Sequence, residues 1–471
     1  MRRWLAGFMF MCILSVSMAG WTSAADLASE PQFEDLKLER ALKAIMQKSE
    51  EESISIQDME ALEVVELRDL GITDLSGLEY GTNIKILDLN RNKISDLQPL
   101  RGLTNIQELH LSHNTVTDLQ NLSEMKNLKS LDISNNQITS IDVLRHFPLL
   151  NTFTADQNQI SDISILSKMV NLDFLRLSAN QIERLQPLSK LNALRSLDLS
   201  FNKIKDVSPL KDLTGLTGLG LGGNQISDLG PLAGMTVLGT LGAANNQIKD
   251  IKPLAKMTKL YQLNLASNQI YDLEPLRNLN KLSYLYLNRN RIWDLSPIEH
   301  MKPDFHYDTG APRYGLQLDH NVLDLKQGTK SNRLFTALNA DPYGRLHQGQ
   351  YQRLVIGSKT AYAGESSFTL LEAPYIHSSR TYVPIRFISE QQGAAVKWSK
   401  GQQAVTITKD GKIIQWTVGN HQVRVNDKVI KYDAPLMLKK GTTFVPVRFV
   451  SEQLNASVEY MSSKKSVLIF P

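Results

Sequence analysis

A row of aspartates is the feature of this sequence best suited to metal chemistry. An Asp stands four residues after a recurring Asn in eight of ten places: Asp96, Asp118, Asp162, Asp206, Asp228, Asp250, Asp272 and Asp294. Stacked carboxylates would supply the oxygen ligands that calcium prefers. The alternative is that each Asp accepts a backbone N–H bond at the start of a short helical turn. We expect the second role, because like charges about 5 Å apart in water repel by only about 0.8 kcal/mol.

Other motifs that could carry chemistry are weak. His110 and His113 are three residues apart, but they fall at the end of an expected strand rather than on a helix, which makes a poor zinc pair. The sequence contains no Gly-x-Ser-x-Gly elbow, no phosphate-binding loop and no His-Glu-x-x-His motif. We therefore predict that the protein is not an enzyme, holds no metal and uses no cofactor.

The recurring Asn belongs to a 22-residue repeat that organises the first two thirds of the chain. A pattern based on Leu-x-Leu-x-x-Asn, with other apolar residues at some Leu positions, recurs every 22 residues with its Asn at Asn92, Asn114, Asn136, Asn158, Asn180, Asn202, Asn224, Asn246, Asn268 and Asn290. The two Leu alternate with polar residues, which predicts a short strand with one buried face. Because one repeat cannot bury that face alone, neighbouring repeats must stack. Each Asn is expected to turn its amide inward and to bond the backbone of adjacent turns.

The repeat resembles the leucine-rich repeat of bacterial internalins, as residues 197–210 illustrate. Residues 33–47 and 56–62 resemble the helical cap of that family, so the resemblance covers about residues 30–325. It implies an α/β solenoid with short strands on the concave side, 3-10 turns on the convex side and a helical N-terminal cap. It also implies binding of a protein or glycan through the concave face. Internalins usually continue into an immunoglobulin-like module, which is not evident in this sequence.

The expected concave face changes character along the chain. Side chains two, four and six residues before each Asn should point into it, because alternate strand residues share a face. We predict ligand contacts from Phe174, Arg176, Asp198, Gly218, Gly220, Gly222, Tyr284 and Tyr286. A glycine floor beside aromatic side chains suits the stacking of a sugar ring or the holding of a peptide. The alternative is that the glycines relieve crowding between strands and the tyrosines pack on the end cap.

A second duplication lies near the C-terminus. The segment TYVPIRFISE at residues 381–390 returns 62 residues later as TFVPVRFVSE at residues 443–452. Each copy predicts a strand, then a helix that begins at the proline, then further strands, which makes an α+β domain of two internal repeats. Arg386 and Glu390 are four residues apart on the expected helix, a spacing typical of a surface ion pair.

This duplicated unit resembles the domain named after the N-terminal part of copper amine oxidases, over about residues 351–471. The resemblance implies a secreted protein of a Gram-positive, spore-forming bacterium such as a paenibacillus. Oxidase chemistry in that family requires a copper-binding His-x-His pair and a quinone-forming Tyr between Asn and an acidic residue. Here His377 and His421 are isolated, and Tyr432 follows a Lys. We therefore expect neither copper nor quinone chemistry.

The N-terminus has the pattern of an export signal. Arg2 and Arg3 precede an apolar run over residues 4–20 and small residues at 23–25, which predicts cleavage after Ala24 or Ala25. The alternative is a membrane anchor, although about 17 residues is at the short limit for a span. Cys12, the one cysteine, lies in this segment, so the mature chain would contain no disulfide.

Charge differs between the two modules. Residues 26–345 carry 34 basic and 40 acidic side chains, a net charge of −6, whereas residues 346–471 carry 16 and 8, a net charge of +8. The formal net charge of the whole chain, +4, is too small for a nucleic-acid binder. A basic terminal module could adsorb to an anionic wall polymer, or the charge could serve solubility alone.

The sequence therefore predicts five segments: a signal peptide at 1–25, a helical cap at 26–64, a solenoid with a capping repeat at 65–325, a linker at 326–350 and the duplicated domain at 351–471. We expect a secreted or wall-associated protein that binds a protein or glycan, or a cell-wall polymer. No membrane span is expected after the signal is removed. One alternative is a structural envelope or spore-surface component without a dedicated ligand. Another is a repeat scaffold like the intracellular regulators of phosphatases, which conflicts with an export signal.

Overall fold

The computed structural model describes residues 30–308, 311–345 and 348–471, so the predicted signal peptide at 1–25 lies outside the described residues. The chain divides into two compact units. Among the described residues, the first contains residues 30–137 together with His146–Leu149, and the second contains Ile138–Arg145 and those from Leu150 to Pro471. No helix in the described ranges is both long enough and apolar enough to cross a membrane.

The first unit begins with two helices that lead into the repeats. Its helices are α2 (Leu36–Ile45) and α3 (Ile56–Glu60), and its parallel strands are β1 (Val64–Glu66), β2 (Ile86–Asp88), β3 (Glu108–His110) and β4 (Ser130–Asp132). Short 3-10 turns follow the strands as η1 (Leu78–Tyr80), η2 (Gln98–Leu100) and η3 (Gln120–Leu122). Helix α2 starts where the Asp35 side chain accepts the Lys37 N–H at 2.9 Å, and its apolar face buries Leu38 and Leu42.

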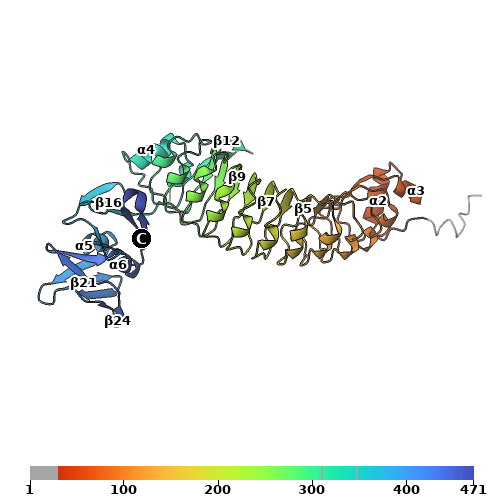
Figure 1. Cartoon of the computed structure of the whole chain (residues 1–471). Helices are drawn as coiled ribbons and strands as arrows, with labels where there is room; N and C mark the ends of the chain where they lie inside the picture. Colours follow the sequence, from red (N-terminus) through yellow and green to blue (C-terminus); the bar gives the residue numbers. More distant parts are fainter. Residues whose placement is uncertain (1–29, 309–310, 346–347) are drawn as a thin grey trace, which may run out of the picture. The chain divides into compact units, whose positions relative to one another are not determined.

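The second unit continues the same repeat. Its parallel strands are β5 (Thr152–Thr154), β6 (Phe174–Arg176), β7 (Ser196–Asp198), β8 (Gly218–Gly220), β9 (Thr240–Gly242), β10 (Gln262–Asn264), β11 (Tyr284–Tyr286) and β14 (Leu316–Gln317). Its turns are η5 (Ser164–Lys168), η6 (Gln186–Leu188), η7 (Ser208–Leu210), η8 (Gly230–Gly234), η9 (Lys252–Lys256), η10 (Glu274–Leu276) and η11 (Ser296–Ile298), and it also holds all but the last residue of η4 (Asp142–His146). Figure 1 shows the strands of this unit side by side in chain order from β5 to β9. The predicted leucine-rich-repeat fold class is confirmed.

The repeated asparagine holds each strand to its neighbours. The Oδ1 atom of Asn180 accepts the Ile160 N–H at 2.9 Å, and its Nδ2 atom donates to the carbonyl oxygens of Ala155 at 2.9 Å and Leu177 at 3.2 Å. The side chain is buried, at 8% exposure. Ala179, immediately before it, has φ +53°, a left-handed conformation that turns the chain out of the strand. The amide thus satisfies backbone groups that this turn leaves without sheet partners.

Each of the eight repeated aspartates accepts a backbone bond. Asp96 is typical, because its Oδ1 atom accepts the Gln98 N–H at 2.9 Å, and the other seven make the same bond. The turn η2 has Leu97 as its N-cap residue, so the Asp lies one position earlier than a helix cap would. These carboxylates therefore close Asx turns that start the 3-10 helices.

The second unit also contains a hairpin and a helix beyond the repeats. The antiparallel hairpin of β12 (Phe305–Asp308) and β13 (Ala311–Tyr314) precedes β14. The segment predicted to be a linker contains helix α4 (Lys330–Ala337) and the turn η12 (Pro342–Arg345). Thr329 accepts the Asn332 N–H at the start of α4, and Phe335 is buried at 2% exposure. Burial of this aromatic ring gives the segment a fixed helical structure.

The C-terminal domain is an antiparallel β structure with two short helices. One sheet has the order β17 (Ser366–Thr369), β16 (Thr360–Ala363), β15 (Gln352–Val355), β28 (Ser466–Phe470) and β27 (Ser457–Met461). The second has β20 (Ala395–Ser399), β21 (Ala404–Lys409), β22 (Lys412–Thr417), β23 (Gln422–Val425) and β24 (Lys428–Lys431). The third has β18 (Tyr375–His377), β19 (Arg380–Pro384), β26 (Thr442–Pro446) and β25 (Met437–Lys439). The helices are α5 (Ile385–Gln391) and α6 (Val447–Gln453), which begin directly after the prolines as predicted, and a turn η13 (Ser462–Lys464) precedes β28.

An apolar cluster joins the last repeats to the C-terminal domain inside the second unit. Trp293, from the last 22-residue repeat, is 8% exposed and packs with Tyr351, Leu468 and Phe470. The ring centroids of Trp293 and Tyr351 are 5.5 Å apart. These contacts bury apolar surface that either part would otherwise expose to water.

Ion pairs surround that cluster. The Nζ atom of Lys464 lies 2.6 Å from the Asp294 carboxylate and 4.6 Å from the centroid of the Trp293 ring. Glu459 accepts from Lys249 at 2.8 Å and lies 3.4 Å from Arg291. Burial alone would raise the pKa of Asp294, but hydrogen bonds from Lys464 and Ser296 outweigh it and hold that pKa below its ordinary value.

We predict that Asn180→Ala destabilises the repeats more than Ser178→Ala. The first substitution leaves the buried Ile160 N–H and two carbonyl oxygens without their hydrogen-bond partner, so the free energy of unfolding should fall by about 1–3 kcal/mol. The second removes a half-buried hydroxyl and should cost less than about 0.5 kcal/mol. Urea denaturation followed by circular dichroism measures both, and equal midpoints would contradict the structural role of the amide.

We predict that Asp294→Asn destabilises the junction in a pH-dependent way. Because the folded-state pKa of Asp294 is lowered, its ionised form stabilises the protein above the unfolded-state pKa of about 3.9. That contribution is lost as the pH falls through the folded-state value. The urea midpoint of Asp294→Asn should therefore lie below that of the native chain at pH 7, and the difference should begin to shrink at about pH 4 and vanish only below the folded-state pKa.

The matched control for this experiment is Asp228→Asn. Asp228 accepts the equivalent backbone bond, from Gly230 at 2.7 Å, and has no lysine partner among the described residues. Its effect should be smaller at pH 7. A pH-independent difference between Asp294→Asn and the native chain would contradict the contribution of the Asp294–Lys464 pair.

Candidate ligand-binding surface

The outward-pointing residues of β6 to β11 form a continuous surface, called here the strand surface. The arginine predicted to contact a ligand there is already held by two carboxylates. Arg176 lies 2.7 Å from Asp156 and 4.0 Å from Asp198, and the buried Asp156 also accepts the Ser178 N–H at 2.7 Å. Arg176 and these two carboxylates therefore hold one another in place at this end of the strand surface. Phe174, on the same strand, is half-buried.

The glycines of the predicted site lie on and just after β8, and neighbouring side chains cover some of them. A Cβ atom on Gly220 would stand 2.4 Å from Oδ1 of Asp198, so the carboxylate occupies the space above this glycine. Gly223 has φ +67°, and a Cβ atom there would stand 2.5 Å from the ring of Phe201, which is 62% exposed. Gly222 meets ordinary contacts. Some of these glycines thus make room for neighbouring side chains, as the crowding alternative expects.

A hollow of about 400 Å3 opens at the edge where the chain enters these strands. Its lining residues are Ser196, Thr217, Gly218, Val237, Gly239, Thr240, Lys259 and Tyr261. The ring of Tyr261 forms one wall against Gly239, where a Cβ atom would stand 3.1 Å from Cε1. Tyr261 is 48% exposed, and Lys259 makes no ion pair with any described residue. The hollow offers an aromatic face, hydroxyl groups and a cation.

The predicted site residues share one surface but not one cavity. Gly218 lines the hollow, whereas Phe174, Arg176 and Asp198 lie on β6 and β7 at its side. The strand pattern did not reveal most of the hollow because Tyr261 and Gly239 stand seven residues before their Asn, just ahead of the strand. One signal in the sequence could have revealed the hollow. Tyr261 is aromatic, whereas the equivalent position one repeat earlier is Gly239.

Tyr284 and Tyr286 lie at the far end of the strand surface, on β11. The side chain of Tyr284 is held in place, because its hydroxyl donates a hydrogen bond to the carboxylate of Asp304. That bond raises the pKa of the Tyr284 hydroxyl above its ordinary value. A tyrosine held in this way presents its ring in a fixed orientation.

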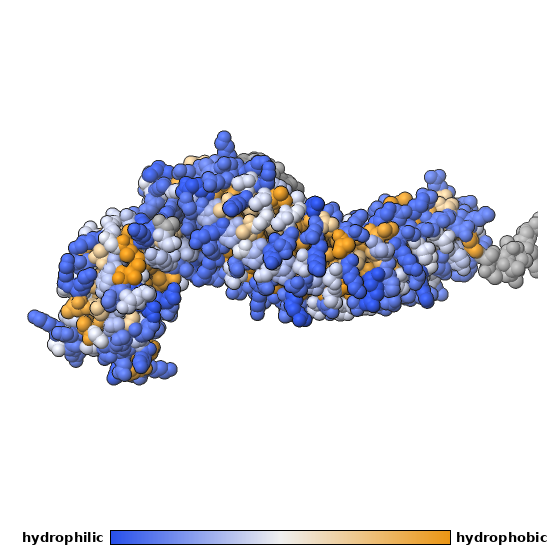
Figure 2. Space-filling model, viewed as in Figure 1, coloured by the Kyte–Doolittle hydropathy of each residue, from blue (hydrophilic) through white to orange (hydrophobic). Residues whose placement is uncertain are grey.

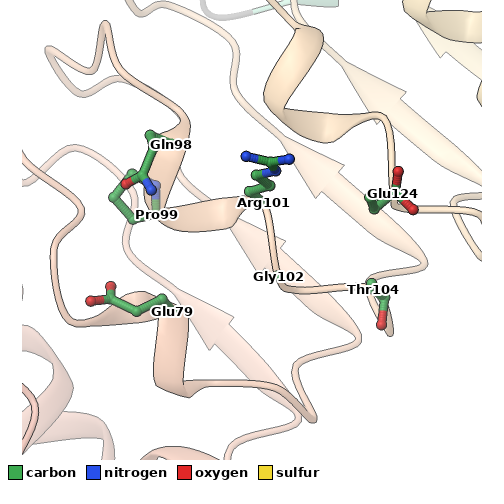
Figure 3. A pocket seen from close by; sticks show the side chains of 7 residues that line it. All are labelled: Glu79, Gln98, Pro99, Arg101, Gly102, Thr104 and Glu124. Atoms are coloured by element: carbon green, nitrogen blue, oxygen red, sulfur yellow. The ribbon is translucent and has the colours of Figure 1, made fainter.

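A hollow in the first unit has a different character. Figure 3 shows its lining side chains on the turn side of the repeats, where Arg101 lies between Gln98 and Glu124. It measures about 480 Å3 and contains no aromatic residue. Glu124 lies 3.4 Å from Lys126, so its charge is already paired at the surface. This is a solvated hollow between successive turns.

No metal centre is formed within the described ranges. No three His, Cys, Asp or Glu side chains come together there as ligands would. His113 has φ +57° at the strand end, and His421 Nδ1 lies 3.1 Å from the Tyr432 carbonyl oxygen. The eight aspartates of the repeats bond to backbone N–H groups instead.

Two protein families match parts of the chain. The Leucine Rich repeats (2 copies) family matches residues 104–146, 192–234, 238–277 and 262–300. The Copper amine oxidase N-terminal domain family matches residues 347–407 and 362–469. None of the curated proteins matches the sequence.

Solved structures of internalins resemble the chain. The internalin InlF from Listeria monocytogenes is 29% identical over 67% of this chain and 92% of its own, with a TM-score of 0.60. Internalin C2 from the same organism is 31% identical over 55% of this chain and 98% of its own, with a TM-score of 0.33. The functional domain of InlJ, also from Listeria monocytogenes, is 18% identical over 82% of this chain and 94% of its own, with a TM-score of 0.48.

The likeness to InlF and the repeat matches agree with the parallel strands and 3-10 turns described above. The second family match falls on the antiparallel sheets and names a domain distinct from the catalytic part of the oxidases. The chain thus contains a leucine-rich-repeat solenoid like that of internalins and a copper amine oxidase N-terminal domain.

Proposed function

We propose that the protein binds a protein ligand through the strand surface from β6 to β11, with the hollow beside Tyr261 as its centre. The observation that carries this proposal is the exposed Tyr261 ring beside hydroxyl groups and Lys259, which pairs with no described carboxylate. Tyrosine is enriched at the energetic centres of protein interfaces, because its ring buries area and its hydroxyl still bonds. The wider repeat fold is one that serves binding rather than catalysis.

The extent of the strand surface favours a protein over a single sugar ring. Six parallel strands at about 4.8 Å spacing span about 24 Å. Along that length the surface runs from the Asp156–Arg176–Asp198 group to the fixed ring of Tyr284. A ligand that contacts both ends must present charged and apolar groups over the same distance, as a folded protein or an extended peptide does.

We further propose that the protein acts outside a Gram-positive cell, and that the C-terminal domain attaches it to anionic wall polymers. Export rests on the N-terminal sequence pattern. Wall attachment is supported by the outer face of the sheet β20–β24, where Lys397, Arg424 and Lys431 are exposed. Lys397 and Arg424 stand in one cross-strand row, separated by Thr406 and Gln415. Such a face attracts polyanions without requiring a specific sequence of groups.

The ligand-binding proposal predicts a position-dependent crosslink. A photoreactive benzoylphenylalanine at Thr240 lies in the hollow, and the same group at the exposed Lys211 lies on a turn. After incubation with cells and culture fluid, illumination should yield protein adducts at Thr240, at least about tenfold more than at Lys211. Tyr261→Ala should lower the Thr240 yield by about tenfold, as expected for a lost interface anchor of about 1.4 kcal/mol. Equal yields at both positions, or adducts with glycan alone, would contradict the proposal.

The wall-attachment proposal predicts retention that depends on salt and on the basic sheet face. The mature chain should bind purified cell wall at about 0.05 M NaCl and elute by about 0.5 M, because added salt screens exposed charges. Reversing Lys397, Arg424 and Lys431 to Glu should abolish retention. The matched control reverses Lys126, Lys190 and Lys211 on the turns of the repeats and should bind as the native chain does. Retention that is unchanged by the first triple substitution would refute this role.

A further inference from the structure

The C-terminal domain contains an open groove of about 690 Å3 that the proposed function does not use. Aromatic and aliphatic side chains dominate its wall, including Phe368, Leu371, Phe387 and Trp398. Leu371 is 78% exposed, and Phe368 and Trp398 are each 38% exposed. Figure 2 shows hydrophobic surface on this domain among hydrophilic residues. A volume of this size with a largely apolar wall is typical of a small-molecule site.

The internal duplication supplies a counterpart for this groove in the same domain. Strands β19 and β26 pair so that Tyr382 stands opposite Pro446, Val383 opposite Val445 and Pro384 opposite Phe444. Equivalent residues of the two halves are 62 positions apart, so Val383 pairs with its own equivalent, Val445. Tyr382 pairs with the equivalent of Pro384, and Pro384 pairs with the equivalent of Tyr382. The two halves are therefore related by an approximate twofold axis, and each groove residue has an equivalent on the other side.

The counterpart of the groove is closed. Its helix residue Phe449, equivalent to Phe387, is 4% exposed and lies under the ring of Tyr432, with centroids 4.5 Å apart. Asp433, next to that tyrosine, forms an ion pair with Arg380. The pair holds the pKa of the Asp433 carboxyl below its ordinary value. An aromatic ring and an ion pair thus fill this side.

Three substitutions between the halves leave the first groove open. Leu370 stands where the other half has Tyr432, so Phe387 lacks a counterpart of that ring, contacts Phe368 at a centroid distance of 5.7 Å and is only half-buried. Leu371 and Thr442 occupy the positions equivalent to Asp433 and Arg380. Both residues line the groove, and neither can form the ion pair that spans the counterpart.

The charges along the groove are uneven. Arg386 and Glu390 form an ion pair at 3.5 Å, as their spacing predicts. Lys400, which also lines the groove, has no ion-pair partner among the described residues. The residues from 346 to 471 carry a net charge of +8, which favours the approach of an anion.

We propose that this groove binds a small amphipathic anion, whose apolar body lies against Phe387 and Trp398 and whose single anionic group pairs with Lys400. Burial of the apolar body supplies most of the affinity, because the groove exposes several large apolar side chains to water. The Lys400 ammonium sets the preference for an acid over a neutral molecule of the same shape. The groove is separate from the strand surface, so this proposal can be tested independently of the ligand proposed for the repeats.

The test uses the full mature chain and two probes, anilinonaphthalene sulfonate and octanoate. The double substitution Leu371→Asp with Thr442→Arg installs the counterpart ion pair across the open groove. We expect it to weaken binding of the fluorescent probe at least about tenfold, and octanoate to displace the probe from the native chain only. Probe binding that the double substitution leaves unchanged would overturn the proposal.

The matched control is Arg380→Thr with Asp433→Leu, which removes the counterpart ion pair and leaves the open groove intact. It should bind the probe within about twofold of the native chain. Circular dichroism establishes folding, and if the double substitution unfolds the domain, the single change Leu371→Asp carries the same expectation, because that side chain is 78% exposed. Equal losses in the control and in the groove variant would also overturn the proposal.

A third substitution tests the anionic group. Lys400→Gln should weaken binding of octanoate about tenfold at low salt and leave binding of octanol unchanged. Sedimentation of the native chain tests the other occupant of an apolar groove, a second copy of the chain. A dimer that the groove substitution dissociates, together with no binding of either probe, would assign the groove to self-association and refute the small-molecule proposal.

Discussion

The side-chain amide of the repeated asparagine is the interaction on which the solenoid depends. Each amide reaches into the preceding repeat, as Asn180 does when it bonds to Ile160 and to Ala155. A change of length inside one repeat would therefore misplace partners in its neighbours. The chain shows how a longer repeat is accommodated, because Asn321 follows Asn290 after 31 residues and still bonds to Ile292 and Leu287. The extra residues form the hairpin β12–β13, outside the ladder of strands.

Most of the repeat architecture could be predicted from the sequence because its determinants are local. The apolar pair, the Asn and, in eight of ten repeats, the Asp fix a strand, a bend and a turn within 22 residues. The aspartates accept backbone N–H bonds at the start of the turns as predicted, and the structure adds that they lie one position ahead of the N-cap, as Asx turns. The segment predicted to be a linker contains a helix, because Phe335 is buried there.

The binding surface was harder to predict, since periodicity gives the direction of a side chain but not its neighbour. Arg176 was expected to meet a ligand, yet Asp156 from the preceding repeat holds it. The hollow beside Tyr261 arises at a position that the strand pattern leaves undefined. In the C-terminal domain the repeated decapeptide predicted two internal repeats. The difference between the grooves comes from Leu370, Leu371 and Thr442, whose importance depends on a twofold pairing that the sequence does not display.

The exchange of strands between the two halves of the C-terminal domain has a consequence for the order of folding. Strand β15 pairs with β28, and β21 pairs with β22, so each of these sheets contains strands from both halves. During synthesis, the repeats can form progressively, since each needs only its neighbours in the chain. The first half of the C-terminal domain has no such partner at hand and must wait until β28 emerges. Its unpaired strand edges then stay exposed to other chains until the second half is complete.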